Sequence, residues 1–352
     1  MRFPARLLGL ALLAALLSAA GPGKPGPAHR PVKVVADARI TLAVGGVRAE
    51  EPIFVSRDWT KPQPGVTRAL VIVHGLGRSA ASYYATGLKA VQGAGAAAKG
   101  TIVVAPQFLN TFDTTAHHLS AATLRWQDAL WEGGENALGP VPLSSYAVLD
   151  AIVARLGERS LFPNLGEVVI AGHSGGGQVV QRYAAVGHAA DRLPAGVALR
   201  FVVANPSSYL WFGTDRPDGK GGFAPFPAAS CPGFDHWKYG LAGLPPYAKG
   251  DDPLRLQRAY AARRITYLLG TADTDPDHPE LDRTCMGEAQ GPTRLARGLA
   301  YLRYLRTHEP AAMAGQRLYL VVGVAHSARA MFTSACGLTA LFGAPGCEPA
   351  RP

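Results

Sequence analysis

The sequence predicts an α/β protein in which helices cover both faces of a mainly parallel sheet. Two observations indicate this fold class. Continuous apolar runs, as expected for strands buried on both faces, alternate along the chain with segments of helical periodicity. The chain has 352 residues, of which 48% are hydrophobic and 17% charged, so it can bury a full core in one large domain or two. Ligands of such sheets bind outside the carboxyl ends of the strands, and we expect a functional site at that edge.

The N-terminus has the pattern of a secretory signal peptide over residues 1–20. Arg2 and Arg6 make its start basic, residues 7–17 are apolar, and small residues follow at 18–20. A membrane anchor is the alternative, but the apolar run is shorter than the ~20 residues that a spanning helix needs. We therefore expect a periplasmic or secreted protein without a stable membrane span after cleavage.

A proline- and glycine-rich leader at 21–31 precedes a domain that is predicted to span 32–352. The leader has the sequence GPGKPGPAHRP, which favours an extended conformation over a helix or a core strand. Next, β-rich runs at 32–44 and 51–55 flank a pair of glycines. This pattern predicts a hairpin at the edge of the sheet.

The body of the domain alternates predicted strands and helices. Buried strands are expected at 68–73, 101–106, 168–171, 199–204, 265–269 and 318–322. Helices are expected from Ser79, from Ser144 or Ser145, after Ser174 and around 295–305. A polar, aromatic segment at 107–142 contains Trp126 and Trp131 and is too long for a simple connection.

The stretch 168–180 predicts a strand, a sharp turn and a helix. Its centre, Gly172-His173-Ser174-Gly175-Gly176, fits the pattern G-x-S-x-G, in which a serine occupies a strained turn that only small flanking residues permit. The hydroxyl then projects from the carboxyl edge of the sheet, so Ser174 is the candidate nucleophile. A phosphate-binding glycine loop is the alternative, but no G-K-[ST] follows.

Other chemically suggestive residues also follow predicted strands. His74 and Gly75 come after one strand, Asp273 after a second and His326 after a third. With these residues the chain resembles the α/β-hydrolase superfamily over most of residues 69 to the C-terminus. The order Ser174, Asp273, His326 is the order in which that superfamily presents its nucleophile, acid and base. The resemblance implies an α/β-hydrolase fold.

The same resemblance implies a role for each residue. His326 would accept the Ser174 proton, and Asp273 would hold the imidazole in the correct tautomer. The backbone N–H groups of Gly175 and Leu76 would form the oxyanion hole, with each donor typically worth ~3 kcal/mol. Two further carboxylates, Asp275 and Asp277, lie in the loop of Asp273 and are alternatives for the acid.

Several other functional classes are not supported by the sequence. The loop at 273–284 lacks the glycine and glutamate of an EF-hand, and His117-His118 has no apparent third metal ligand. The formal net charge is +10, but Lys and Arg are scattered and no basic stripe suggests nucleic acid. We therefore expect no metal, no cofactor and no nucleic-acid partner.

All four cysteines lie in the C-terminal third of the chain. Cys231, Cys285, Cys336 and Cys347 form an even set in a chain predicted to be exported, which favours disulfides over zinc because no C-x-x-C pair exists. Three pairings are possible. Proximity favours Cys336 with Cys347, which leaves Cys231 with Cys285.

A cap-like, aromatic-rich insertion is predicted at about 207–262, where the superfamily commonly inserts a cap. A packed surface Ω-loop is the alternative. We expect its rings to form an apolar acyl or alcohol pocket. These rings are Tyr209, Trp211, Phe212, Phe223, Phe226, Phe234, Trp237, Tyr239 and Tyr247.

The predicted function is that of a serine hydrolase, a carboxylesterase or lipase-like enzyme that works through an acyl-enzyme. Its partner would be a small-molecule or lipid-like ester. An exported acyltransferase with the same triad, or a non-catalytic binding protein on the same fold, are the alternatives. No feature of the sequence separates carboxylic esters from thioesters, polyesters or amides as substrates.

Overall fold

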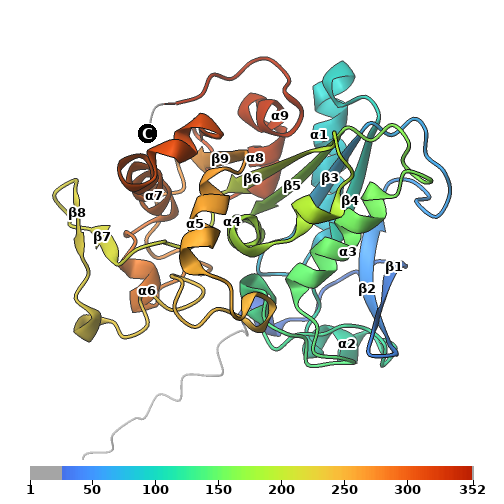
Figure 1. Ribbon diagram of the computed structural model, residues 1–352, viewed down its shortest axis with the longest axis horizontal. Coiled ribbons are helices and arrows are strands. Elements are labelled where there is room, and N and C mark those ends of the chain that lie inside the picture. The colour runs from blue at the N-terminus through green and yellow to red at the C-terminus, as the bar shows by residue number, and fades with distance from the viewer. Residues whose placement is uncertain (1–25, 351–352) are drawn as a thin grey trace, which may run out of the picture.

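The computed structural model describes residues 26–350, and its centre is an eight-stranded sheet (Figure 1). The strand order is β1-β2-β4-β3-β5-β6-β9-β10. All neighbours from β4 to β10 are parallel, whereas β2 is antiparallel to both β1 and β4. The strands are β1 (Ala38–Val44), β2 (Val47–Val55), β3 (Arg68–Val73), β4 (Thr101–Pro106), β5 (Glu167–His173), β6 (Ala198–Ala204), β9 (Ile265–Gly270) and β10 (Gln316–Val321). The mainly parallel sheet is therefore confirmed.

Helices pack on both faces of this sheet, as predicted. The reason is visible in β3, where Leu70 and Ile72 point to one face while Val71 and Val73 point to the other, and all four are fully buried. The first face is covered by α1, α8 and α9, and the second by α3, α4, α5 and α7. The helices are α1 (Ala80–Ala94), α2 (Thr111–Ala116), α3 (Ser145–Gly157), α4 (Gly175–Val186), α5 (Pro253–Ala261), α6 (Cys285–Glu288), α7 (Arg294–His308), α8 (Ala328–Thr333) and α9 (Ala335–Phe342).

Two long connections carry short elements of their own. The connection between β4 and α3 contains α2 and a single 3-10 turn, η3 (Leu130–Gly133). The connection between β6 and β9 contains α5 and the hairpin β7 (Asp215–Pro217) and β8 (Phe223–Pro225). That hairpin stands at the left margin of Figure 1, away from the sheet.

The N-terminal segment packs against the loop that follows β3. The predicted signal peptide and residues 21–25 lie outside the described residues, and the rest of the expected extended leader includes one 3-10 turn, η1 (Pro27–His29). The backbone carbonyl of Arg30 accepts a hydrogen bond from Arg78, at 2.6 Å. Arg78 also forms a fully buried ion pair with Asp113 of α2, at 2.6 Å. The leader, the loop after β3 and α2 are thus joined through one guanidinium group.

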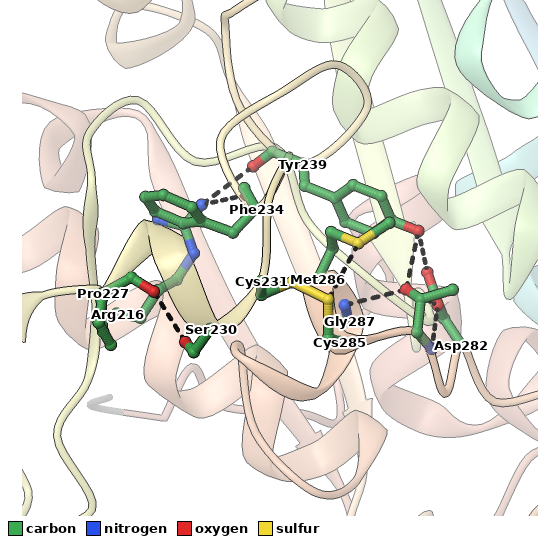
Figure 2. The surroundings of a disulfide bond; sticks show 11 residues. Arg216, Pro227, Ser230, Cys231, Phe234, Tyr239, Asp282, Cys285, Met286 and Gly287 are labelled. Carbon is green, nitrogen blue, oxygen red and sulfur yellow. Dashed lines mark hydrogen bonds between the residues drawn. A yellow bond between two sulfur atoms is a disulfide. The ribbon is translucent and has the colours of Figure 1, made fainter.

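Both favoured disulfides are present. Cys231 is bonded to Cys285 across a sequence separation of 54, and Cys336 to Cys347 across 11. The first joins the connection between β6 and β9 to α6, and Figure 2 shows it beside the hydrogen bond between Tyr239 and Asp282. No helix within residues 26–350 is both long and apolar enough to cross a membrane.

The two disulfides are expected to differ in their contribution to stability. A disulfide lowers the conformational entropy of the unfolded chain, and it does so more when it closes a longer loop. The disulfide that closes 54 residues should therefore add about 4 kcal/mol to the free energy of unfolding, and the one that closes 11 residues about 3 kcal/mol. Urea unfolding should therefore show a larger loss for Cys231→Ala with Cys285→Ala than for Cys336→Ala with Cys347→Ala. The reverse order would show that local packing, and not loop length, determines the effect.

Candidate active site

Ser174 occupies a sharp turn between β5 and α4. Its φ of 59° lies in the left-handed region, which costs a non-glycine residue of order 1–3 kcal/mol unless the surroundings hold it there. The backbone is tightly packed around this turn. A Cβ atom on Gly172 would lie only 2.2 Å from the carbonyl oxygen of Gly176. A Cβ on Gly176 would lie 2.2 Å from the carbonyl oxygen of Val73 in β3. The glycines of the motif are therefore required by backbone packing.

His326 and Asp273 lie next to this serine. The Nε2 atom of His326 is 2.9 Å from Ser174 Oγ, and its Nδ1 atom is 2.7 Å from Asp273 Oδ2. The three residues come from the ends of β5, β9 and β10, which are parallel and so end at one edge of the sheet. All three side chains are nearly inaccessible to solvent. With Nδ1–H donating to the carboxylate, Nε2 is free to accept the serine proton.

Only one of the three neighbouring carboxylates contacts the imidazole. The second oxygen of Asp273 lies 3.5 Å from Nη1 of Arg294, whose side chain is fully buried. Asp275 instead accepts a hydrogen bond from the backbone N–H of Asp277, at 2.9 Å. Asp277 lies 3.6 Å from Arg283, and both carboxylates are exposed. The structure therefore brings Asp273 to His326 and leaves the two alternatives at the surface.

The two residues whose backbone N–H groups are expected to form an oxyanion hole lie close together. A Cβ on Gly175 would lie 3.1 Å from the backbone nitrogen of Leu76. Within residues 26–350, neither of these N–H groups has a hydrogen-bond acceptor. Unpaired donors beside a nucleophile are suited to receive a developing negative charge.

His74 holds the loop that carries Leu76. Its Nε2 atom accepts a hydrogen bond from the backbone N–H of Phe108 at 3.0 Å, and its Nδ1 atom lies 2.9 Å from the carbonyl oxygen of Gly75. The ring is fully buried and contacts the ring of Trp131. Burial lowers the pKa of His74 to about 4, so that the imidazole is neutral near pH 7. This contact ties the loop after β3 to the segment after β4.

A second buried histidine, His173, packs against the imidazole of His326, with the ring centroids 4.5 Å apart. Burial holds the pKa of His173 well below its ordinary value, so it adds no positive charge beside His326. Sequence reasoning missed this contact. Its only signal is that His173 directly precedes Ser174.

A cavity of about 280 Å³ opens beside Ser174. Its walls include the charged residues Glu132, Lys238, Glu280 and Asp282. None of these four residues was singled out from the sequence, because each comes from a loop or short turn without a motif. A cavity with this lining accepts polar or charged groups.

The aromatic pocket that we expected is not found at this cavity, where Tyr239 is the one aromatic residue among the described residues of the wall. The rings of the insertion pack inward instead. Trp211 is fully buried and contacts Tyr301 and Tyr304 of α7, with centroids 5.6 and 4.6 Å apart. The physical reason is that the insertion lacks a core of its own and buries its rings against the main one.

The structure offers no obvious metal site. In the part of the chain that it describes, no three His, Cys, Asp or Glu side chains are grouped so that they could hold a metal ion. One of the histidines considered from the sequence, His117, places Nε2 2.7 Å from the carbonyl oxygen of Val32.

Comparisons with known proteins agree with the fold. A sequence model of the alpha/beta hydrolase family matches residues 70–328. The structure of poly(aspartic acid) hydrolase-1 from Sphingomonas sp. KT-1 is 24% identical, with a TM-score of 0.55 over 86% of this chain and 96% of that chain. LpqC, a poly(3-hydroxybutyrate) depolymerase from Bordetella parapertussis, is 20% identical, with a TM-score of 0.58 over 92% of this chain and 97% of that chain. No curated protein sequence matches the chain.

The buried His74 should make the protein sensitive to acid. Its pKa rises from about 4 in the folded state to about 6.5 on unfolding, so below pH 6.5 the unfolded chain binds the additional proton. This contribution to stability is complete above pH 6.5 and is lost as the pH falls towards 4, by about 3 kcal/mol in all. We expect His74→Gln, which keeps an acceptor for Phe108, to flatten the dependence of the unfolding free energy on pH in this range.

Urea unfolding at a series of pH values measures this slope. The control is His236→Gln, because His236 is exposed at the surface. An unchanged slope in His74→Gln would contradict the assignment of acid sensitivity to this residue.

Proposed function

The chain belongs to the alpha/beta hydrolase family, and on this premise we propose that it is a serine hydrolase that cleaves carboxylic esters through an acyl-enzyme intermediate. One observation carries the proposal. Ser174, His326 and Asp273 form a continuous chain of hydrogen bonds, 2.9 and 2.7 Å long, beside a cavity. We assign them the roles of nucleophile, base and acid.

The acylation step follows from this geometry. An ester carbonyl enters the cavity, Ser174 Oγ attacks its carbon, and His326 Nε2 takes the serine proton. The oxygen of the carbonyl becomes negatively charged and receives hydrogen bonds from the N–H groups of Leu76 and Gly175. His326 then donates the proton to the departing alcohol, and the acyl group remains on Ser174.

Deacylation repeats the sequence with water. His326 takes a proton from water, which attacks the acyl carbon, and the acid leaves when the proton returns to Ser174. Asp273 accepts the Nδ1–H bond throughout and stabilises the imidazolium that forms in each half-reaction. The ion pair with Arg294 holds Asp273 in place.

We also propose that the enzyme acts outside the cytoplasm, in the periplasm or in the medium. Two features support this site of action. Residues 1–20 have the composition of a signal peptide. The two disulfides are typical of proteins that fold in an oxidising compartment.

The first test concerns the nucleophile. Ser174→Ala should lose labelling by a fluorophosphonate probe and should lose at least about 10³-fold in kcat on a short activated ester, because no other group would form the acyl-enzyme. Its thermal unfolding should stay close to that of the wild type, since only one oxygen atom is removed. Comparable hydrolysis by Ser174→Ala would refute the assignment.

A second test concerns the acid. Asp273→Asn should lower kcat by several orders of magnitude, of order 10⁴-fold, because the amide favours the wrong tautomer of His326. Asp275→Asn is the matched control in the same loop and should cost little, because that carboxylate bonds to its own loop. Equal losses in the two variants would place the acid elsewhere.

A further inference from the structure

We propose that the cavity beside Ser174 selects acyl donors that carry a positively charged group, and that Glu132 and Glu280 recognise this group. The inference rests on the proposed function, because it treats the cavity as the place where the acyl donor binds. It concerns which substrates are chosen, and not whether Ser174 is the nucleophile.

The main evidence for this inference is the environment of the Glu132 carboxylate. Its side chain is only 5% exposed, and one of its oxygens, Oε2, lies 3.2 Å from Lys238 Nζ and 3.3 Å from Gln178 Nε2. The other oxygen, Oε1, has no donor among the described residues. It lies against the start of α4, where a Cβ on Gly175 would be 2.3 Å away. This oxygen is not among the fully buried polar atoms that lack a partner, so it is accessible from the cavity. A donor or a cation of a bound ligand can therefore reach it.

Most of the charged groups in the wall are negative. Three carboxylates, those of Glu132, Glu280 and Asp282, border the cavity together with the single ammonium group of Lys238. Lys238 is already paired with Glu132. The described residues that line the cavity therefore carry three negative charges and one positive charge, an excess that favours a ligand cation.

The free acceptors lie on two of these carboxylates. Asp282 already accepts hydrogen bonds from the hydroxyls of Tyr239 and Thr284, at 2.7 and 2.6 Å. Glu280 has no hydrogen bond or ion pair to its carboxylate within residues 26–350, and it is partly exposed. Glu132 comes from η3, whereas Glu280 comes from the loop after β9. Two separate segments thus contribute carboxylate oxygens without a hydrogen-bond donor among the described residues to the same cavity: Oε1 of Glu132, and both oxygens of Glu280.

The position of Glu132 also affects the transition state. Its free oxygen lies beside Gly175, whose N–H is a proposed oxyanion donor, and a carboxylate there opposes the negative charge that develops on the substrate. A substrate cation bound by Glu132 reduces this repulsion. The preference for cationic substrates is therefore expected in kcat/KM, and not only in binding.

Three para-nitrophenyl esters of one chain length test the inference at constant ionic strength. Their acyl chains end in trimethylammonium, in the uncharged isostere tert-butyl, or in sulfonate. The wild type should hydrolyse the cationic ester with a kcat/KM at least about tenfold above that of the tert-butyl ester, and the sulfonate ester most slowly. In Glu132→Gln and Glu280→Gln, the ratio of cationic to tert-butyl ester should fall several-fold.

The matched control is Glu158→Gln, which changes the net charge equally at an exposed position outside the cavity. Its ratio should equal that of the wild type. Equal rates for the three esters, a preference for sulfonate, or a wild-type ratio in both cavity variants would overturn the inference while leaving the hydrolase intact. No turnover of any ester, together with no fluorophosphonate labelling of Ser174, would instead overturn the proposed function.

A binding measurement covers the case in which the esters react slowly. Hexyltrimethylammonium should protect Ser174 from fluorophosphonate labelling at a lower concentration than hexanesulfonate does. Loss of this difference in Glu132→Gln supports the inference, and equal protection of the wild type by the two ions contradicts it.

Discussion

The turn at Ser174 is the constraint on which the rest of the site depends. Helix α4 approaches β5 and the end of β3 so closely there that a side chain on Gly172 would overlap the carbonyl of Gly176, and one on Gly176 would overlap the carbonyl of Val73. The positive φ of Ser174 persists because buried strands lie on both sides of β5 and leave the turn no room to relax. The same packing places Gly175, the first residue of α4, close to the backbone nitrogen of Leu76. The positions of the serine and of Gly175, a proposed oxyanion donor, therefore have a common physical origin.

The loop of Leu76 is fixed separately, by buried polar contacts with the segment that follows β4. His74 accepts a hydrogen bond from the backbone of Phe108, and Arg78 is paired with Asp113. Removing one partner of such a contact leaves the other buried and unpaired, which costs several kcal/mol, so these contacts allow only one arrangement of the loop. The long connection between β4 and α3 thus forms one side of the site.

Different residues of the insertion between β6 and β9 pack in the core and line the cavity. Its buried rings, such as Trp211, extend the hydrophobic core over α7. Lys238 and Tyr239 instead line the cavity. Figure 2 shows Tyr239 near the disulfide between Cys231 and Cys285. The proposed charge selection rests on the carboxylates and the ammonium group of this cavity, because a ligand of the wrong sign would leave them without partners.

The sequence by itself determined the parallel sheet, the turn at Ser174 and the strand-end positions of the other two triad candidates, because apolar periodicity and glycine spacing depend on neighbouring residues. Only the tertiary structure decided which carboxylate of its loop reaches the imidazole, since Asp273 is held by His326 from the loop after β10 and by Arg294 of α7. The approach of Glu132 to Gly175 and the inward packing of Trp211 were likewise not predictable. Each depends on contacts between residues far apart in the chain, and no local pattern records such contacts.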